Sequence, residues 1–111
     1  MRSALLSLFL VLAGAARAEG PITYTELPPG RYTVAVHGMI CTVCARAIAA
    51  EWAKLPEVDK ASMDYEKSSG IVSIRLDRTL PVAALRRALR RAERTANLGA
   101  RFELRDIAYI P

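Results

Sequence analysis

The chain has 111 residues, a formal net charge of +5 and only two cysteines. This length allows one small domain with a single core, and it excludes a multidomain enzyme. The charge is mild, and basic residues are not interleaved with aromatic ones, so nucleic acid is not an expected partner.

The first 18 residues have the pattern of a secretory signal peptide. A short basic start precedes an apolar run at residues 4–13, which is too short to span a bilayer. Ala16 and Ala18 are the small residues that a signal peptidase reads, and cleavage is predicted after Ala18. Loss of Arg2 and Arg17 lowers the net charge from +5 to +3. We expect a soluble periplasmic protein, with an uncleaved amphipathic anchor as the alternative.

A linker is predicted at residues 19–30, which end in a Pro-Pro-Gly turn, and the domain at residues 31–111. Within the linker, residues 22–25 could form an edge strand. Residues 31–36 then alternate between apolar and polar side chains, which predicts a half-buried strand. Its inward face carries Tyr32, Val34 and Val36.

A helix is predicted from Cys44 to Leu55, because Cys44, Ile48, Trp52 and Leu55 share one face at helical spacing. Pro56 ends it. Two strands follow at residues 58–65 and 71–76, joined by a turn at residues 66–70. The inward residues of the second strand are expected to be Val72, Ile74 and Leu76.

A second helix is predicted from the start signals Thr79 and Pro81 to Asn97, with Gly99 as its terminating residue. A last strand is predicted at residues 100–110. Strand, helix, strand, strand, helix, strand is the order of the split βαβ, ferredoxin-like α+β fold, with two helices on one face of a four-stranded antiparallel sheet. The apolar arc of the second helix is Val82, Leu85, Leu89, Ala92 and Ala96.

The opposite side of this helix carries five arginines. Such a face is usually solvated, and its alternative role is docking to an acidic membrane-protein surface or to anionic lipid. The five residues are Arg86, Arg87, Arg90, Arg91 and Arg94.

Cys41 and Cys44 are three residues apart between the first strand and the first helix. Thiols at this spacing can hold one soft metal ion or form one disulfide. A disulfide would close almost no loop and so would stabilise little. Helix-terminal amides near Cys44 favour its thiolate form. Cys41, upstream in the loop, is the expected first contact for an incoming ion, and Cys44 is expected to complete the site.

The sequence Gly-Met-x-Cys-x-x-Cys, placed after the first strand of a βαββαβ order, resembles the heavy-metal-associated domain family over residues 31–107. The layout is similar to that of its periplasmic mercury-binding members and its secreted copper-binding members. The resemblance implies one soft metal ion, Hg(II) or Cu(I), held by Cys41 and Cys44. It also implies that Met39 packs beneath the loop.

Two positions depart from the family pattern. Ile40 stands where Thr is usual and where Asp marks zinc and cadmium transporters, so Zn(II) lacks an extra oxygen ligand. Arg101 follows the second helix where the family usually has an aromatic residue or Lys, and it could offset the charge of a bis-thiolate site. His37, just before the motif, could add a ligand, although strand alternation directs it to solvent.

The leading hypothesis is therefore a binding protein and not an enzyme. It would be a monomeric periplasmic carrier that passes a soft ion to a membrane metal transporter or metal-transporting ATPase. The alternative is a small exported thiol-disulfide oxidoreductase that uses the same two cysteines. A metal sensor or adaptor is a third possibility.

Overall fold

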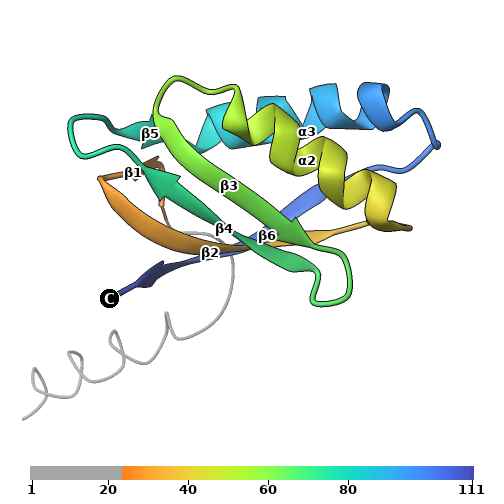
Figure 1. Cartoon of the computed structure of the whole chain (residues 1–111), viewed down its shortest axis with the longest axis horizontal. Helices are drawn as coiled ribbons and strands as arrows, with labels where there is room; N and C mark the ends of the chain where they lie inside the picture. Colours follow the sequence, from red (N-terminus) through yellow and green to blue (C-terminus); the bar gives the residue numbers. More distant parts are fainter. Residues whose placement is uncertain (1–23) are drawn as a thin grey trace, which may run out of the picture.

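The computed structural model describes residues 24–111 (Figure 1), so the predicted signal peptide lies outside the described residues. The elements, in chain order, are β1 (Glu26–Leu27), β2 (Gly30–His37), α2 (Thr42–Ala53), β3 (Val58–Asp64), β4 (Ser69–Ile74), β5 (Leu80–Pro81), α3 (Val82–Ala96) and β6 (Glu103–Ile110).

Four antiparallel strands form the main sheet in the order β3-β4-β2-β6, and β1 pairs with β5 in a separate two-stranded sheet. Both α2 and α3 lie over one face of the main sheet (Figure 1). This arrangement confirms the predicted ferredoxin-like fold.

Alternating side chains of the central strand β2 supply the middle of the core, as the sequence predicts. Tyr32, Val34 and Val36 are buried, whereas Thr33 and His37 are exposed. Neighbouring strands flank β2 on both sides, so its backbone hydrogen-bonding groups are paired by β4 and β6. This rigid strand leads directly into the cysteine-containing loop.

The two helices pack against each other through the apolar faces that their periodicity predicts. Ile48 and Trp52 of α2 and Leu85 and Leu89 of α3 are fully buried. The indole Nε1 of Trp52 donates a hydrogen bond to the backbone oxygen of Leu85 at 3.2 Å. This bond satisfies the one polar atom of the indole ring, so Trp52 can be buried without an unpaired donor.

Part of the predicted linker belongs to the folded domain. Leu27 in β1 is fully buried, and β2 begins at Gly30. The edge strand expected at residues 22–25 is displaced: Thr25 lies outside any strand, and Ile22 and Thr23 lie outside the described residues. A single apolar side chain among Pro and Glu gives no periodic signal, so the sequence pattern does not reveal that Leu27 joins the core.

The prediction that Leu76 points inward is wrong, since its side chain is 91% exposed. β4 ends at Ile74, two residues earlier than expected. The backbone N–H of Arg75 then donates to the oxygen of Glu57 at 2.9 Å, and that of Arg78 donates to the oxygen of Arg75 at 3.1 Å. The chain turns here, so the alternation of a strand no longer applies to Leu76.

Element ends shift by a few residues from the predicted bounds. α2 runs from Thr42 to Ala53, two residues ahead of the prediction at each end. α3 ends at Ala96, and its C-cap residue Asn97 has the left-handed backbone conformation typical of a helix terminus. Among residues 24–111, no helix has both the length and the apolar composition needed to cross a membrane.

Candidate metal centre

The cysteine loop, residues 38–41, connects the end of β2 to the start of α2. Gly38 has a φ of +106°, which residues with a side chain rarely adopt. A Cβ atom here would lie 2.0 Å from the backbone oxygen of Arg101. Glycine is therefore required both for the turn and for close packing of the loop against the segment that follows α3.

The two cysteines have different surroundings. Cys41 is the N-cap residue of α2 and is half-buried, whereas Cys44 lies in the first turn and is fully buried. Cys41 is thus the more exposed thiol, as predicted. The sequence pattern predicts that Cys44 opens the helix, but Cys41 lies at the helix terminus because α2 already begins at Thr42. No side-chain hydrogen bond caps the helix, so capping does not occupy the Cys41 thiol.

In the part of the chain that the structure describes, the two thiols have no third strong ligand beside them. Among residues 24–111, no group of three or more His, Cys, Asp or Glu side chains could hold a metal ion. His37 is exposed at the end of β2, as predicted, in register with Glu103. Met39 is partly buried and packs against the core, which agrees with its expected packing role. Two cysteine thiols form a donor set that suits soft metal ions.

A polar network holds the segment after α3 beside the cysteine loop. The Glu93 carboxylate accepts a hydrogen bond from the backbone N–H of Phe102 at 2.7 Å. It also pairs with Arg90 at 3.1 Å and with Arg101 at 3.8 Å. Arg90 donates a further hydrogen bond to the backbone oxygen of Phe102. Both polar groups of the Phe102 backbone are therefore held from α3, and Phe102 itself is buried.

Glu93 is a residue that the sequence pattern does not mark as functional. The one available signal is a single acidic residue among five arginines, three positions after Arg90 on the same helix. Arg101, which the sequence suggests as a counter-charge for the site, has Glu93 as its ion-pair partner and is 81% exposed.

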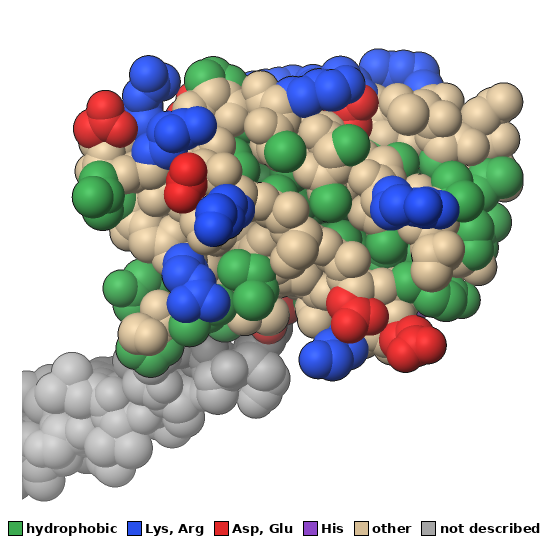
Figure 2. Space-filling model, in the orientation of Figure 1, with side chains coloured by type: hydrophobic (Ala, Val, Ile, Leu, Met, Phe, Trp, Pro, Cys, Tyr) green, Lys and Arg blue, Asp and Glu red, His purple; other side chains and the backbone are tan. Residues whose placement is uncertain are grey.

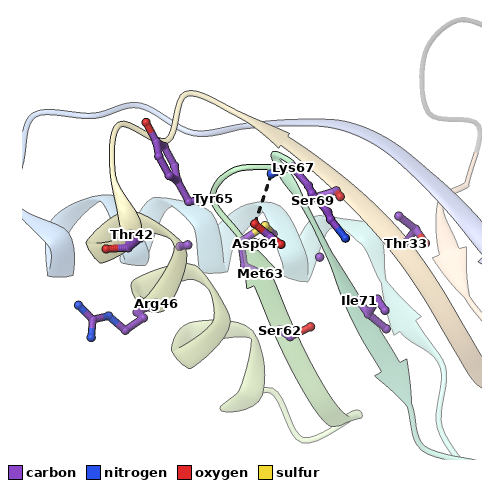
Figure 3. Close-up of a pocket in the computed structure, with 12 residues that line it drawn as sticks. Thr33, Thr42, Arg46, Ser62, Met63, Asp64, Tyr65, Lys67, Ser69 and Ile71 are labelled. Atoms are coloured by element: carbon purple, nitrogen blue, oxygen red, sulfur yellow. Dashed lines mark hydrogen bonds between the residues drawn. The ribbon is translucent and has the colours of Figure 1, made fainter.

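A groove of about 870 Å³ borders the start of α2 (Figure 3). Thr42 and Arg46 line it from α2, and Lys67 and Ile71 line it from the β3–β4 hairpin. In Figure 3 the Arg46 side chain extends away from the hairpin residues. Neither cysteine lines this groove. The groove is therefore not part of the cysteine site, which solvent reaches through the half-buried Cys41.

Comparison with known protein families identifies the fold family. The model of the heavy-metal-associated domain matches residues 33–95, more than half of the chain, and this segment contains both cysteines. The chain belongs to the heavy-metal-associated domain family. The match begins within β2 and ends within α3, so β6 lies beyond it. Membership in this family indicates that the domain binds a heavy metal.

Two solved structures are similar to this chain. A crystal structure of a copper-binding domain from HMA7, a P-type ATPase, is 20% identical with a TM-score of 0.51, covering 67% of this chain and 90% of that one. A second, from work on crosstalk between Cu(I) and Zn(II) homeostasis, is 23% identical with a TM-score of 0.43, covering 67% of this chain and 96% of that one. At such identities the likeness to the first shows the fold alone. Comparison with curated proteins gives no match.

Proposed function

We propose that this heavy-metal-associated domain is a periplasmic carrier of one soft metal ion, Hg(II) or Cu(I), which it passes to a membrane metal transporter. Cys41 and Cys44 are the proposed ligands. The observation that carries the proposal is the thiol pair at the start of α2, with one thiol accessible and the other in the core. The ion is cargo, and no bond in a substrate is broken.

Capture would proceed by ligand exchange between sulfur atoms. The half-buried Cys41 thiol loses its proton and forms a bond to the incoming ion, while a bond from the ion to its donor breaks. The Cys44 thiol then loses its proton and replaces a second donor ligand. Release to an acceptor is the reverse sequence, so the ion is never free in solution. Because both thiols must be deprotonated, affinity should fall as pH falls.

The surroundings of the thiols favour a soft ion over Zn(II). The side chain next to Cys41 in the loop is Ile40, which offers no oxygen ligand. A tetrahedral zinc site usually takes four ligands from Cys, His, Asp or Glu, and residues 24–111 bring together no group of three. Two thiolates satisfy the low coordination number that Hg(II) and Cu(I) accept.

Transfer kinetics test the carrier function. Protein loaded with Cu(I) is mixed with increasing amounts of a reduced acceptor domain that carries its own thiol pair, in the presence of a chelator that removes free ion. Direct exchange predicts a transfer rate that rises in proportion to acceptor concentration. A rate that is independent of acceptor would mean release into solution and would contradict the carrier function.

Two redox assays distinguish the carrier from the oxidoreductase. The reduced protein is assayed for insulin reduction, and the oxidised protein for reactivation of a reduced, unfolded disulfide protein. We expect no catalysis in either assay. Turnover comparable to that of an established oxidoreductase, and lost in Cys41→Ser, would replace the carrier proposal with the enzyme.

A further inference from the structure

The net positive charge of the described chain lies on one helix. α3 carries five arginines and one glutamate, a net charge of +4. The rest of residues 24–111 carries nine Lys or Arg and nine Asp or Glu residues, so it is neutral. Figure 2 shows basic side chains along the upper edge of the molecule, where α3 lies in Figure 1. The charge is therefore a property of one face and not of the whole surface.

Two of the five arginines are neutralised within the domain. Arg91 pairs with Glu51 at 3.1 Å, and Arg90 pairs with Glu93 at 3.1 Å. The other three are exposed and form no ion pair with any residue in the range 24–111. Because like charges on one helix face repel each other, an approaching anionic surface would relieve an unfavourable interaction. These unneutralised residues are Arg86, Arg87 and Arg94.

Exposed aliphatic side chains lie at the end of the molecule toward which α3 runs. Leu98, two residues after α3, is 45% exposed, and Ile40 and Val43 at the start of α2 are 54% and 42% exposed. The close approach of Gly38 to Arg101 brings the two segments together. In Figure 2 hydrophobic side chains gather at this end. A basic helix face thus adjoins an apolar end.

We propose that the arginine face of α3 and Leu98 dock the protein onto a membrane surface of anionic phospholipid. Arginines near such a surface are attracted by its negative potential, and an adjacent aliphatic side chain gains free energy by entering the interface. The contact would place the end that carries Cys41 close to the bilayer. If the proposed carrier function holds, this shortens the search for a membrane transporter; the docking itself does not require a metal ion.

Lipid fits this surface better than a protein partner does. Protein interfaces are enriched in Tyr and Trp anchors, and α3 and Leu98 offer neither. Tyr65, which is half-buried at the same end of the molecule, lines the groove beside Thr42, and no residue of α3 lines that groove. Trp52 is fully buried, and the exposed Tyr109 lies at the end of the sheet remote from the cysteine loop. The exposed side chains here are arginine and branched aliphatic residues, the combination that binds at a lipid interface.

Vesicle binding tests the proposal. The reduced, metal-free chain without residues 1–18, which retains every described strand and helix, is sedimented with vesicles of equal parts phosphatidylglycerol and phosphatidylcholine. We expect binding to these vesicles, little binding to pure phosphatidylcholine, and loss of binding at high salt. Replacing Arg86, Arg87 and Arg94 with Gln should lower partitioning about a hundredfold, since each basic side chain at an anionic surface adds roughly fivefold.

A matched variant separates the arginine face from the net charge. Arg31, Lys60 and Lys67 are exposed and lie outside α3, and none forms an ion pair within the part of the chain that the structure describes. Changing all three to Gln removes the same charge, and we expect most of the binding to remain. Equal losses in the two triple variants would overturn the proposal. Absence of binding to the anionic vesicles by the unaltered chain would also overturn the proposal. An acidic protein would then be the remaining candidate partner for the arginine face of α3.

Leu98→Ser tests the apolar part of the contact. We expect roughly a fivefold to tenfold loss of partitioning, because a partly exposed Leu gains only part of its full burial free energy. Circular dichroism and thermal unfolding of each variant check that the fold is intact. Unchanged partitioning of a folded Leu98→Ser variant would contradict insertion of this side chain.

Discussion

At the residue scale, identical thiols acquire different accessibility from their positions on α2. Cys41 is the N-cap and is half-buried, whereas Cys44 faces the core with Ile48 and Trp52 behind it on the same helix face. A reagent can reach Cys41 from solvent, but Cys44 becomes reachable only when the first turn of α2 opens. An incoming ion should follow the same order of contact.

We therefore predict that iodoacetamide modifies Cys41 at least about tenfold faster than Cys44 in the reduced, metal-free protein, since a factor of ten corresponds to only about 1.4 kcal/mol of local opening. Peptide mass spectrometry over a time course measures both rates. Denatured protein, in which both cysteines are exposed, is the control and should show similar rates. Equal rates in the folded protein would contradict the structural difference between the thiols.

At the element scale, Glu51 links the two helices. Its side chain is 6% exposed, and it pairs with Lys54 on α2 and with Arg91 on α3, each at 3.1 Å. Thr95 donates a further hydrogen bond at 3.4 Å. Burial alone would raise the pKa of Glu51, but the hydrogen bonds and charges of Lys54 and Arg91 outweigh burial and lower the pKa below its ordinary value of 4.5.

Because the pKa of Glu51 is lowered in the folded state, the ionised carboxylate stabilises the fold, and stability falls in acid. The contribution of Glu51 to stability is present above pH 4.5, the ordinary pKa, and is lost as pH falls through the lowered folded value. Glu51→Gln should reduce the free energy of unfolding by about 1–3 kcal/mol at neutral pH. Urea unfolding measures this loss, and the difference between variant and parent should shrink in acid. A difference that stays constant into acid would mean that the carboxylate charge does not stabilise the fold.

Glu93 connects α3 to the segment that supports the cysteine loop. Because it holds the backbone N–H of Phe102, Glu93→Ala should loosen residues 98–102 and, through the Gly38 contact, residues 38–41. Hydrogen exchange should become faster in both segments, with a loss of about 1–3 kcal/mol in the free energy of unfolding.

Glu93→Gln retains an acceptor oxygen and should restore part of the protection against hydrogen exchange. Exposed Arg86→Ala on the same helix is the control. Faster exchange at residues 98–102 alone would show that the cysteine loop does not depend on this support.

At the scale of the whole molecule, local periodicity was enough to predict the fold. The alternation of Tyr32, Val34 and Val36 predicts a strand, and the helical spacing of Ile48 and Trp52 predicts a helix. Both predictions are confirmed, because each pattern places an apolar face against the same core. The motif around Cys41 and Cys44 predicts membership in the heavy-metal-associated domain family, which the family comparison confirms.

Features that depend on tertiary contacts could not be predicted in the same way. The sequence pattern misplaces the start of α2 by two residues, because Thr42 and Val43 are exposed and carry no periodic signal. Leu27 joins the core through the pairing of β1 with β5, which are distant in sequence. The role of Glu93 arises only when the segment after α3 folds back against Gly38.

The central claim is that Cys41 and Cys44 together hold one soft metal ion. The most direct measurement is a titration of the reduced chain with Cu(I) or Hg(II), followed by native mass spectrometry and by competition with a chelator of known affinity. We predict a plateau at one equivalent, loss of tight binding in Cys41→Ser and in Cys44→Ser, and nearly unchanged affinity in His37→Ala. Full affinity in Cys41→Ser would contradict the two-thiolate site.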